Sequence, residues 1–327
     1  MNERDPQPPH RIVFLVPGQG GDPRCALRDL YRADSASRAT IYDLIADIER
    51  ASDGAGQGLR EVLLSDSTSP AMAPGIPQLA SYAVSVVLDR LLTAAGFRPD
   101  VIVGQSFGEI AALVCAGVFD VTDGTRAVCA LNAAFRGFEG RGAMVLVLAS
   151  EPDTRLLLDE VGRSDLVVAC VNSPKQTIVS GPADAIAALF ERQGDGPRLV
   201  RLAVPYASHH PGLVVVADRF RAGLRRTRQR PLRVPVHSPV GRRTYADTED
   251  LREALVDCVV KPVDLVKALR HTDTPGTTLF IELGVGDGLS RCVHATLPAA
   301  RTLAPLAGDL SWLTGTPSKS PVPLRQR

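Results

Sequence analysis

The sequence of 327 residues is poor in net charge, in lysine and in long apolar runs. Its formal net charge of +1 argues against a protein that binds nucleic acid or a membrane surface through overall charge. Only four residues are lysine, and the other cations are arginine. The longest apolar runs fall far short of a membrane span. We therefore expect neither nucleic acid nor a membrane among its partners.

Signs of secretion and of metal binding are also missing. No two cysteines form a C-x-x-C pair, and several lie in apolar runs, which favours a reduced, cytoplasmic protein with buried thiols. The first residues, 1–9, are polar and contain no apolar signal segment. We expect no metal site and no bound cofactor. The six cysteines are Cys25, Cys115, Cys129, Cys170, Cys258 and Cys292.

Short apolar runs that end in glycine-rich turns are the main structural signal. Hydrophobic residues make up 45% of the chain, enough for a full core in one large domain, with or without a smaller inserted one. Residues 12–16 lead into Pro17-Gly-Gln-Gly-Gly21, and residues 101–103 lead into Gly104-Gln-Ser-Phe-Gly108. Helical patterns follow at 109–116 and occur at 76–96. This order predicts a buried sheet covered by helices.

The stretch 142–204 has a different pattern. Its expected order is strand, helix, strand, strand, helix, strand, over residues 143–149, 151–161, 166–172, 176–180, 183–193 and 199–204. This βαββαβ order is typical of a ferredoxin-like unit. We expect an α/β fold with a large α/β-hydrolase-like domain, 11–141 and 205–313, and an inserted ferredoxin-like small domain, 142–204. The large domain should resume after a strand at 233–237, and residues 1–10 and 315–327 should be flexible termini.

The G-x-S-x-G pattern around Ser106 predicts a nucleophile. Two glycines allow a sharp turn between strand and helix, which exposes the serine at a helix N-terminus. There the backbone N–H of Phe107 can face a developing oxyanion. The pattern is common by chance, and the alternative is an ordinary serine in a glycine-rich turn. The flanking strand and helix patterns favour the nucleophile.

A serine nucleophile needs a base, and six histidines are available. They are His10, His209, His210, His237, His271 and His294. His10 lies in the polar N-terminal stretch and is a poor candidate. His209 and His210 follow a predicted strand at the point where the chain re-enters the large domain. Spacing alone leaves His209, His210 and His237 open.

Over roughly residues 11–300 the chain resembles the malonyl-CoA:acyl carrier protein transacylases and the acyltransferase domains of polyketide synthases. The resemblance depends on several blocks in the right order, any one of which alone would be weak. The blocks are Phe14-Leu-Val-Pro-Gly-Gln-Gly20, Gly104-Gln-Ser-Phe-Gly-Glu109, Gly142-Ala-Met144, Asn172-Ser-Pro174, Val179-Ser-Gly181, Tyr206-Ala-Ser-His209, Lys261-Pro-Val263 and Ile281-Glu-Leu-Gly284. An ordinary α/β-hydrolase is disfavoured, because Pro17-Gly-Gln-Gly20 replaces its HGGG-type block.

The resemblance assigns roles to individual residues. Ser106 would be the nucleophile, His209 the general base, and the backbone N–H groups of Gln19 and Phe107 the oxyanion hole. The reaction would be ping-pong: an acyl thioester acylates Ser106, and a phosphopantetheine thiol of a carrier protein then accepts the group. A backbone carbonyl near Cys258, where a glutamine is usual, would hold the histidine.

One position departs from malonyl-type members of the family. Their arginine, which grips the substrate carboxylate, corresponds to Leu131 here, so we expect malonyl and methylmalonyl to be poor substrates. Arg126 and Arg136 each lie five residues away and would serve only if the helix were offset by one turn. The Tyr206-Ala-Ser-His209 block resembles the form associated with α-branched units. Further substrate-binding candidates are Gln105, Met144, Tyr206, Ser208 and Cys258.

Stand-alone members without the arginine include the acyltransferases of macrolactam pathways of the vicenistatin type. The first hypothesis is therefore transfer of an aminoacyl or dipeptidyl-type group between carrier proteins in polyketide biosynthesis. Alternatives are a malonyl or methylmalonyl transacylase, an editing thioesterase that uses the same pair, and an inactive scaffold that only binds a carrier.

Carrier proteins are acidic, so exposed cations are candidates for docking them. Arg136 and Arg141 precede the small domain, and Arg242 and Arg243 follow it. The run 225–230 contains four more arginines, but a solvated helix end is the better interpretation of that run.

Overall fold

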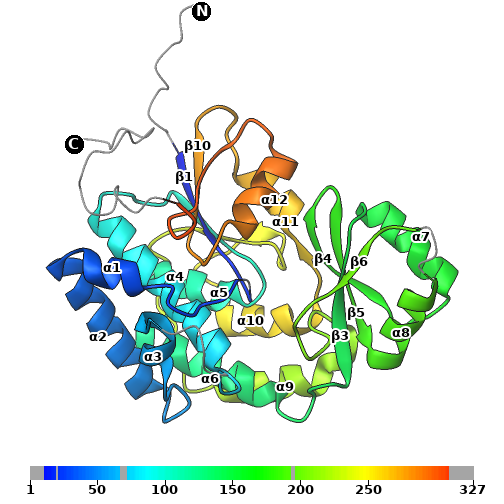
Figure 1. Cartoon of the computed structure of the whole chain (residues 1–327), viewed down its shortest axis with the longest axis horizontal. Helices are drawn as coiled ribbons and strands as arrows, with labels where there is room; N and C mark the ends of the chain where they lie inside the picture. The colour runs from blue at the N-terminus through cyan, green and yellow to red at the C-terminus, as the bar shows by residue number, and fades with distance from the viewer. Residues whose placement is uncertain (1–10, 20, 67–71, 193–195, 309–327) are drawn as a thin grey trace, which may run out of the picture.

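The computed structural model describes residues 11–19, 21–66, 72–192 and 196–308. Two sheets organise this part of the chain, and Figure 1 shows the smaller one beside the larger, to the right. The predictions for residues 1–10, 309–327 and Gly20 concern parts of the chain outside the described residues.

The larger sheet has six strands in the order β11-β10-β1-β2-β7-β8. All pairs are parallel except β7 with β8. The expected strand near 233–237 begins later, at Val236. The strands are β1 (Arg11–Val16), β2 (Val101–Gly104), β7 (Val236–Ser238), β8 (Arg243–Thr244), β10 (Thr278–Glu282) and β11 (Arg301–Leu303).

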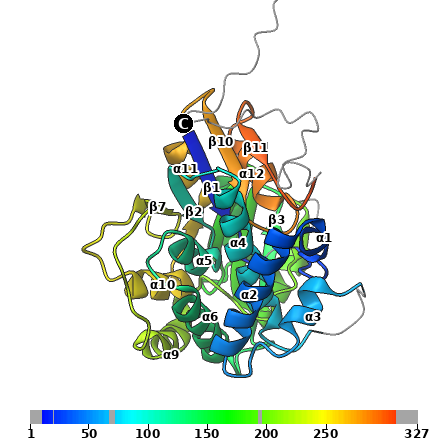
Figure 2. The ribbon, with the colours of Figure 1, turned by 90° about the vertical axis from the view of Figure 1, so that its left-hand side faces the viewer.

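Helices cover both faces of this sheet because alternate side chains of its strands point to opposite sides. Phe14 and Val16 of β1 pack into a large core with α2–α6, α9 and α10, whereas Val13 and Leu15 pack against α11 and α12. Figure 2 shows the first face, where α2 and α3 lie nearest the viewer. The helices are α1 (Arg28–Ala33), α2 (Ser35–Ala51), α3 (Leu59–Leu64), α4 (Ile76–Ala94), α5 (Gly108–Cys115), α6 (Val121–Phe135), the 3₁₀ turn η1 (Pro211–Leu213), α9 (Val214–Leu224), α10 (Leu251–Val260), α11 (Leu265–Thr272) and α12 (Gly288–Thr296).

The smaller sheet has the order β6-β3-β5-β4-β9. Two helices cover one face, and the other face presents Met144, Cys170 and Ile178 to a separate apolar cluster that includes Val240. Its elements are β3 (Gly142–Val147), α7 (Glu151–Val161), β4 (Val167–Ser173), β5 (Gln176–Pro182), α8 (Ala183–Arg192), β6 (Leu199–Arg201) and β9 (Val263–Asp264).

The mixed α/β architecture and the order of elements in 142–201 agree with the sequence patterns. One strand does not. β9 lies in the stretch that we expected to belong to the larger domain, yet Val263 and Asp264 pair in parallel with β4 of the smaller sheet. The two sheets are therefore joined by a third chain segment besides the two ends of 142–201.

Candidate active site

Ser106 lies in a sharp turn between β2 and α5. Its φ of 56° is in the left-handed region, which is uncommon for a residue with a side chain. The turn is held by hydrogen bonds from Gln105 N to Val16 O, 2.8 Å, and from Glu109 N to Ser106 O, 3.0 Å. Strained backbone of this kind is typical of a residue that must be presented in one orientation.

The glycines on both sides of Ser106 are required by close packing. A Cβ at Gly104 would lie 2.6 Å from Glu109 Cα, and one at Gly108 would lie 2.3 Å from Val16 O. Both contacts are with backbone, which cannot move aside without shifting a strand or a helix. The two glycines of the G-x-S-x-G pattern are therefore needed because α5 approaches β1 and β2 closely.

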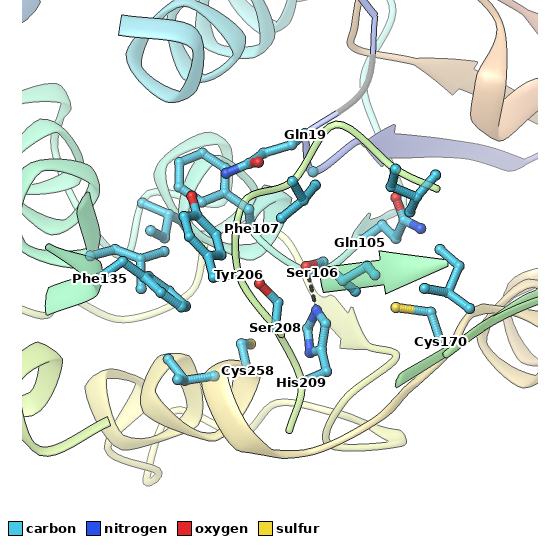
Figure 3. Close-up of a pocket in the computed structure, with 18 of the residues that line it drawn as sticks. Gln19, Gln105, Ser106, Phe107, Phe135, Cys170, Tyr206, Ser208, His209 and Cys258 are labelled. Carbon is cyan, nitrogen blue, oxygen red and sulfur yellow. Dashed lines mark hydrogen bonds between the residues drawn. The ribbon is translucent and has the colours of Figure 1, made fainter. Parts of the chain in front are cut away.

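His209 is the histidine that meets Ser106. Its Nε2 lies 2.6 Å from Ser106 Oγ, and Figure 3 shows the two side chains pointing toward one another. Its Nδ1 lies 3.0 Å from the main-chain oxygen of Lys261. Because a carbonyl only accepts, Nδ1 carries the proton and Nε2 is left to accept the hydroxyl proton of Ser106. This is the tautomer that a general base needs.

Burial controls the charge of this histidine. His209 is 2% exposed, and burial lowers its pKa to about 4, opposed by the hydrogen bond to Lys261 O. The imidazole is therefore neutral at physiological pH and ready to accept a proton. Its supporting partner is a peptide carbonyl, which carries no charge to stabilise an imidazolium as strongly as a carboxylate would.

The supporting carbonyl corrects one expectation. We expected it near Cys258, but it belongs to Lys261, three residues later. Lys261 has φ −99° and ψ 149°, and the proline that follows it restricts it to this extended region. Pro262 thus helps to set the direction of the carbonyl that holds His209.

The other histidines are occupied elsewhere. His210 Nε2 donates to Asp165 O at 3.0 Å, and its Nδ1 accepts from Gly212 N. His237 stacks on His271, with ring centroids 4.4 Å apart, and contacts Thr244. The alternatives that spacing left open therefore reduce to His209.

The two expected oxyanion donors lie at the nucleophile. Gly18 packs so close to the turn that a Cβ there would be 2.9 Å from Gln105 O and 3.5 Å from Phe107 N. This contact places the residue after it, Gln19, beside the turn, and both Gln19 and Phe107 line the cavity at Ser106. Figure 3 shows them on the same side of the serine.

A cavity of about 120 Å³ opens from Ser106 and His209, between the smaller sheet and the helices α6, α9 and α10. Every residue that we expected to bind substrate lines it: Gln105, Leu131, Met144, Tyr206, Ser208 and Cys258. The remaining walls are mostly apolar. They consist of Gly18, Ile110, Asn132, Phe135, Cys170, Ile178, Leu202, Val204, Phe220, Leu255 and Val259.

Among the described residues, no arginine or lysine lines this cavity. Arg126 is exposed and pairs with Asp123 at 3.5 Å. Arg136 lies past the end of α6, where its main-chain oxygen accepts a hydrogen bond from Arg219. A one-turn offset of the helix is therefore not observed, and Leu131 is the residue of α6 that faces the cavity at this position.

Sequence reasoning missed several residues in and beside the cavity wall. Phe135 stacks on Tyr206 with centroids 4.2 Å apart. It lies four residues after Leu131, so the i, i+4 rule was the signal that could have found it. Asn132 also lines the wall, and Asn172 accepts a 2.9 Å hydrogen bond from Gln105 Nε2. That amide pair connects the nucleophile turn to β4 of the smaller sheet.

The expected docking arginines lie on the surface, and they differ in whether a neighbouring side chain contacts them. Arg141 and Arg219 both lie over the ring of Phe138, at 5.6 and 5.5 Å from its centroid. Arg242 is exposed, with φ 55°, whereas Arg243 pairs with Glu249.

The described ranges contain no cluster of His, Cys, Asp and Glu that could hold a metal ion, and all six cysteines are free thiols. Every helix within those ranges is too short or too polar to span a bilayer.

The chain is similar to acyltransferase domains of known sequence and structure. The family model described as acyl transferase domain matches residues 13–310. Polyketide synthase GfsE of Streptomyces halstedii is 34% identical over 303 residues, which cover 92% of this chain but only 8% of that protein. The acyltransferase domain from the second module of the salinomycin polyketide synthase is 30% identical, with a TM-score of 0.78, and the match covers 90% of this chain and 68% of that one. A type II polyketide synthase malonyl-transacylase, solved in complex with its acyl-carrier protein, shares the fold at 23% identity and a TM-score of 0.81, over 93% and 99% of the chains.

The low pKa of His209 predicts how Ser106 reacts with an alkyl fluorophosphonate. Because the histidine stays neutral down to about pH 4, modification should still proceed at pH 5.5 and vanish only as the pH falls below about 4. Intact-mass measurement of the adduct against pH tests this, with Ser106→Ala as the blank. Complete loss of reaction between pH 7 and 6, as for an ordinary imidazole, would contradict it.

The packing at Gly108 gives a second prediction. Gly108→Ala should lower stability by about 1–3 kcal/mol through overpacking and slow modification of Ser106 by about 100-fold, because the turn must shift. Gly288→Ala is the matched control: its nearest neighbour would be 4.0 Å away and its φ is not positive. Thermal melts and fluorophosphonate kinetics on both variants check this, and equal behaviour of the two would refute it.

Proposed function

Because the chain belongs to the acyl transferase domain family, we propose that it moves an acyl group from one thiol to another through an ester on Ser106. The hydrogen bond between Ser106 Oγ and neutral His209 Nε2 is the arrangement that such a step needs.

In the first half-reaction His209 Nε2 takes the proton of Ser106 while Oγ attacks the thioester carbon. The carbonyl oxygen gains the negative charge and is stabilised by the backbone N–H groups of Gln19 and Phe107. The carbon–sulfur bond then breaks, and His209 returns the proton to the leaving thiol. The product is an acyl ester on Ser106.

In the second half-reaction a phosphopantetheine thiol replaces the first. His209 takes its proton, the sulfur attacks the ester carbonyl, and Ser106 leaves with the proton restored. We propose an acyl carrier protein as donor and as acceptor of the group. A transacylase that shares this fold has been solved with its acyl-carrier protein, which supports that choice.

The proposed substrate class is inferred from the uncharged cavity wall. Burying a carboxylate against Leu131 would leave its charge unpaired, and an unpaired buried charge costs about 3–5 kcal/mol. We therefore propose a substrate without a free carboxylate, of the aminoacyl or dipeptidyl type. Asn132 and Tyr206 supply an amide and a phenol in the wall, groups that can hydrogen-bond an amine or amide in the acyl chain.

A malonyl or methylmalonyl substrate is the second candidate, favoured by the malonyl-transacylase among the structures that share the fold. Substitutions at position 131 distinguish a substrate with a free carboxylate from one without. Leu131→Arg should raise loading of Ser106 from malonyl-CoA by 10-fold or more, because a guanidinium would pair with the carboxylate. Leu131→Met, similar in size and uncharged, should leave malonyl loading low.

Intact-mass measurement of the malonyl adduct tests both variants. Efficient malonyl loading by the unchanged protein would contradict the proposed substrate class, whatever the variants do.

The fate of the ester tests transfer itself. With an aminoacyl thioester of a carrier protein as donor, we expect a Ser106 adduct that persists until a second carrier protein is added and then appears on that carrier. His209→Ala should abolish loading. If the adduct is lost to water as fast without an acceptor as with one, the protein is an editing thioesterase. If no donor gives an adduct, the protein is a scaffold that only binds a carrier.

A further inference from the structure

Glu109 is a buried carboxyl to which the reaction above gives no part. It lies in the first turn of α5, three residues after Ser106, and is 0% exposed. It does not line the cavity, so it touches no substrate. A buried carboxyl is costly unless hydrogen bonds satisfy it, and its retention here calls for a reason.

Two hydroxyl groups donate to this carboxyl. Ser238 Oγ donates to Oε1 at 2.6 Å, and Tyr245 Oη donates to Oε2 at 2.7 Å. The Cys258 thiol donates to Ala254 O at 3.6 Å, and Cys258 and the main chain of Val240 lie close enough to the carboxyl to favour its ionised form. These neighbours come from β7, from the turns that follow it and from α10, so the side chain of Glu109 lies where three segments meet α5.

The same side chain connects the supports of both reacting groups. Its own N–H donates to Ser106 O, within the turn that presents the nucleophile. Cys258 lies one helical turn before Lys261, whose carbonyl holds His209. A hydrogen bond of 3.0 Å from Asp264 N to Pro239 O ties the turn after β7 to the segment that carries this carbonyl.

We propose that Glu109 is a positioning residue that holds the nucleophile turn and the histidine-supporting end of α10 in register, so that Ser106 Oγ and His209 Nε2 stay aligned. The inference rests on the proposed function, because it concerns the same serine and histidine. It assigns the buried carboxyl a role in rate rather than in substrate binding.

The charge of Glu109 gives the proposal a distinctive readout. Burial raises its pKa to about 7, opposed by the hydrogen bonds from Ser238 and Tyr245. The titratable groups that face it, Tyr245 and Cys258, have raised pKa values and stay neutral, and Arg243, over the ring of Tyr245, pairs with Glu249. The ionised carboxyl accepts from both hydroxyl groups, whereas protonation turns one of its oxygens into a donor. Alignment should therefore improve as pH rises through 7.

The experiment uses the full chain and an alkyl fluorophosphonate, which reports on Ser106 without any acyl donor. Glu109→Gln should reduce the maximal modification rate by about 10- to 100-fold, the scale expected for a small misalignment, with unchanged half-saturation for the probe. The unchanged protein should show a partial rise in rate centred near pH 7. The variant should lack that rise and keep only the final loss near pH 4 that belongs to His209.

A matched control is Asp89→Asn. Asp89 is also a buried carboxyl whose pKa burial raises, to about 6, and it lies beside Cys115 at the opposite end of α5. Its variant should keep the modification rate and the rise near pH 7. An equal loss of rate in the two variants would overturn the proposal, as would a Glu109→Gln protein with the original rate and pH profile.

If Glu109→Gln does not fold, Tyr245→Phe tests the role of Glu109 instead. It keeps the carboxyl and removes one donor to its ionised form, so the rise should move to higher pH. A rise that stays at pH 7 would overturn the proposal. Failure of every acyl donor to load Ser106, with fluorophosphonate results as expected, would instead count against the proposed function alone.

Discussion

The hydrogen bond between Ser106 and His209 depends on backbone contacts that side chains do not replace. The serine is held by a left-handed turn that only fits because Gly104 and Gly108 allow the helix to approach two strands. The histidine is held by the main-chain oxygen of Lys261. Both groups are thus fixed by the path of the chain, and the neutral, buried imidazole follows from the same packing.

The smaller sheet completes the site in two ways. It supplies Met144, Cys170 and Ile178 to the cavity wall, and it binds β9, which begins two residues after the carbonyl that holds His209. The amide pair of Gln105 and Asn172 adds a direct contact from the nucleophile turn to β4. The supports of the serine and the histidine therefore both contact β4, although the segments lie far apart in sequence.

Local sequence patterns were enough for the elements next to Ser106, because glycine spacing and a strand–helix order are local properties. His209 was different: spacing left three histidines open, and only the resemblance selected one. β9 has two residues and no strand pattern, since its pairing depends on where β4 lies. The error between Cys258 and Lys261 has the same origin, because a main-chain acceptor leaves no mark in residue type. Phe220, Leu255 and Val259 were missed because tertiary packing decides which face of a helix meets the cavity.

The carbonyl of Lys261 has a consequence for how this protein can diverge over time. Every residue type carries a main-chain oxygen, so changes in the codon for position 261 leave the acceptor for His209 in place. What the acceptor requires is the course of the chain at Lys261, which the neighbouring Pro262 restricts. A search that scores the side chain at position 261 would therefore miss chains that keep this acceptor and retain others in which the loop has lost its course.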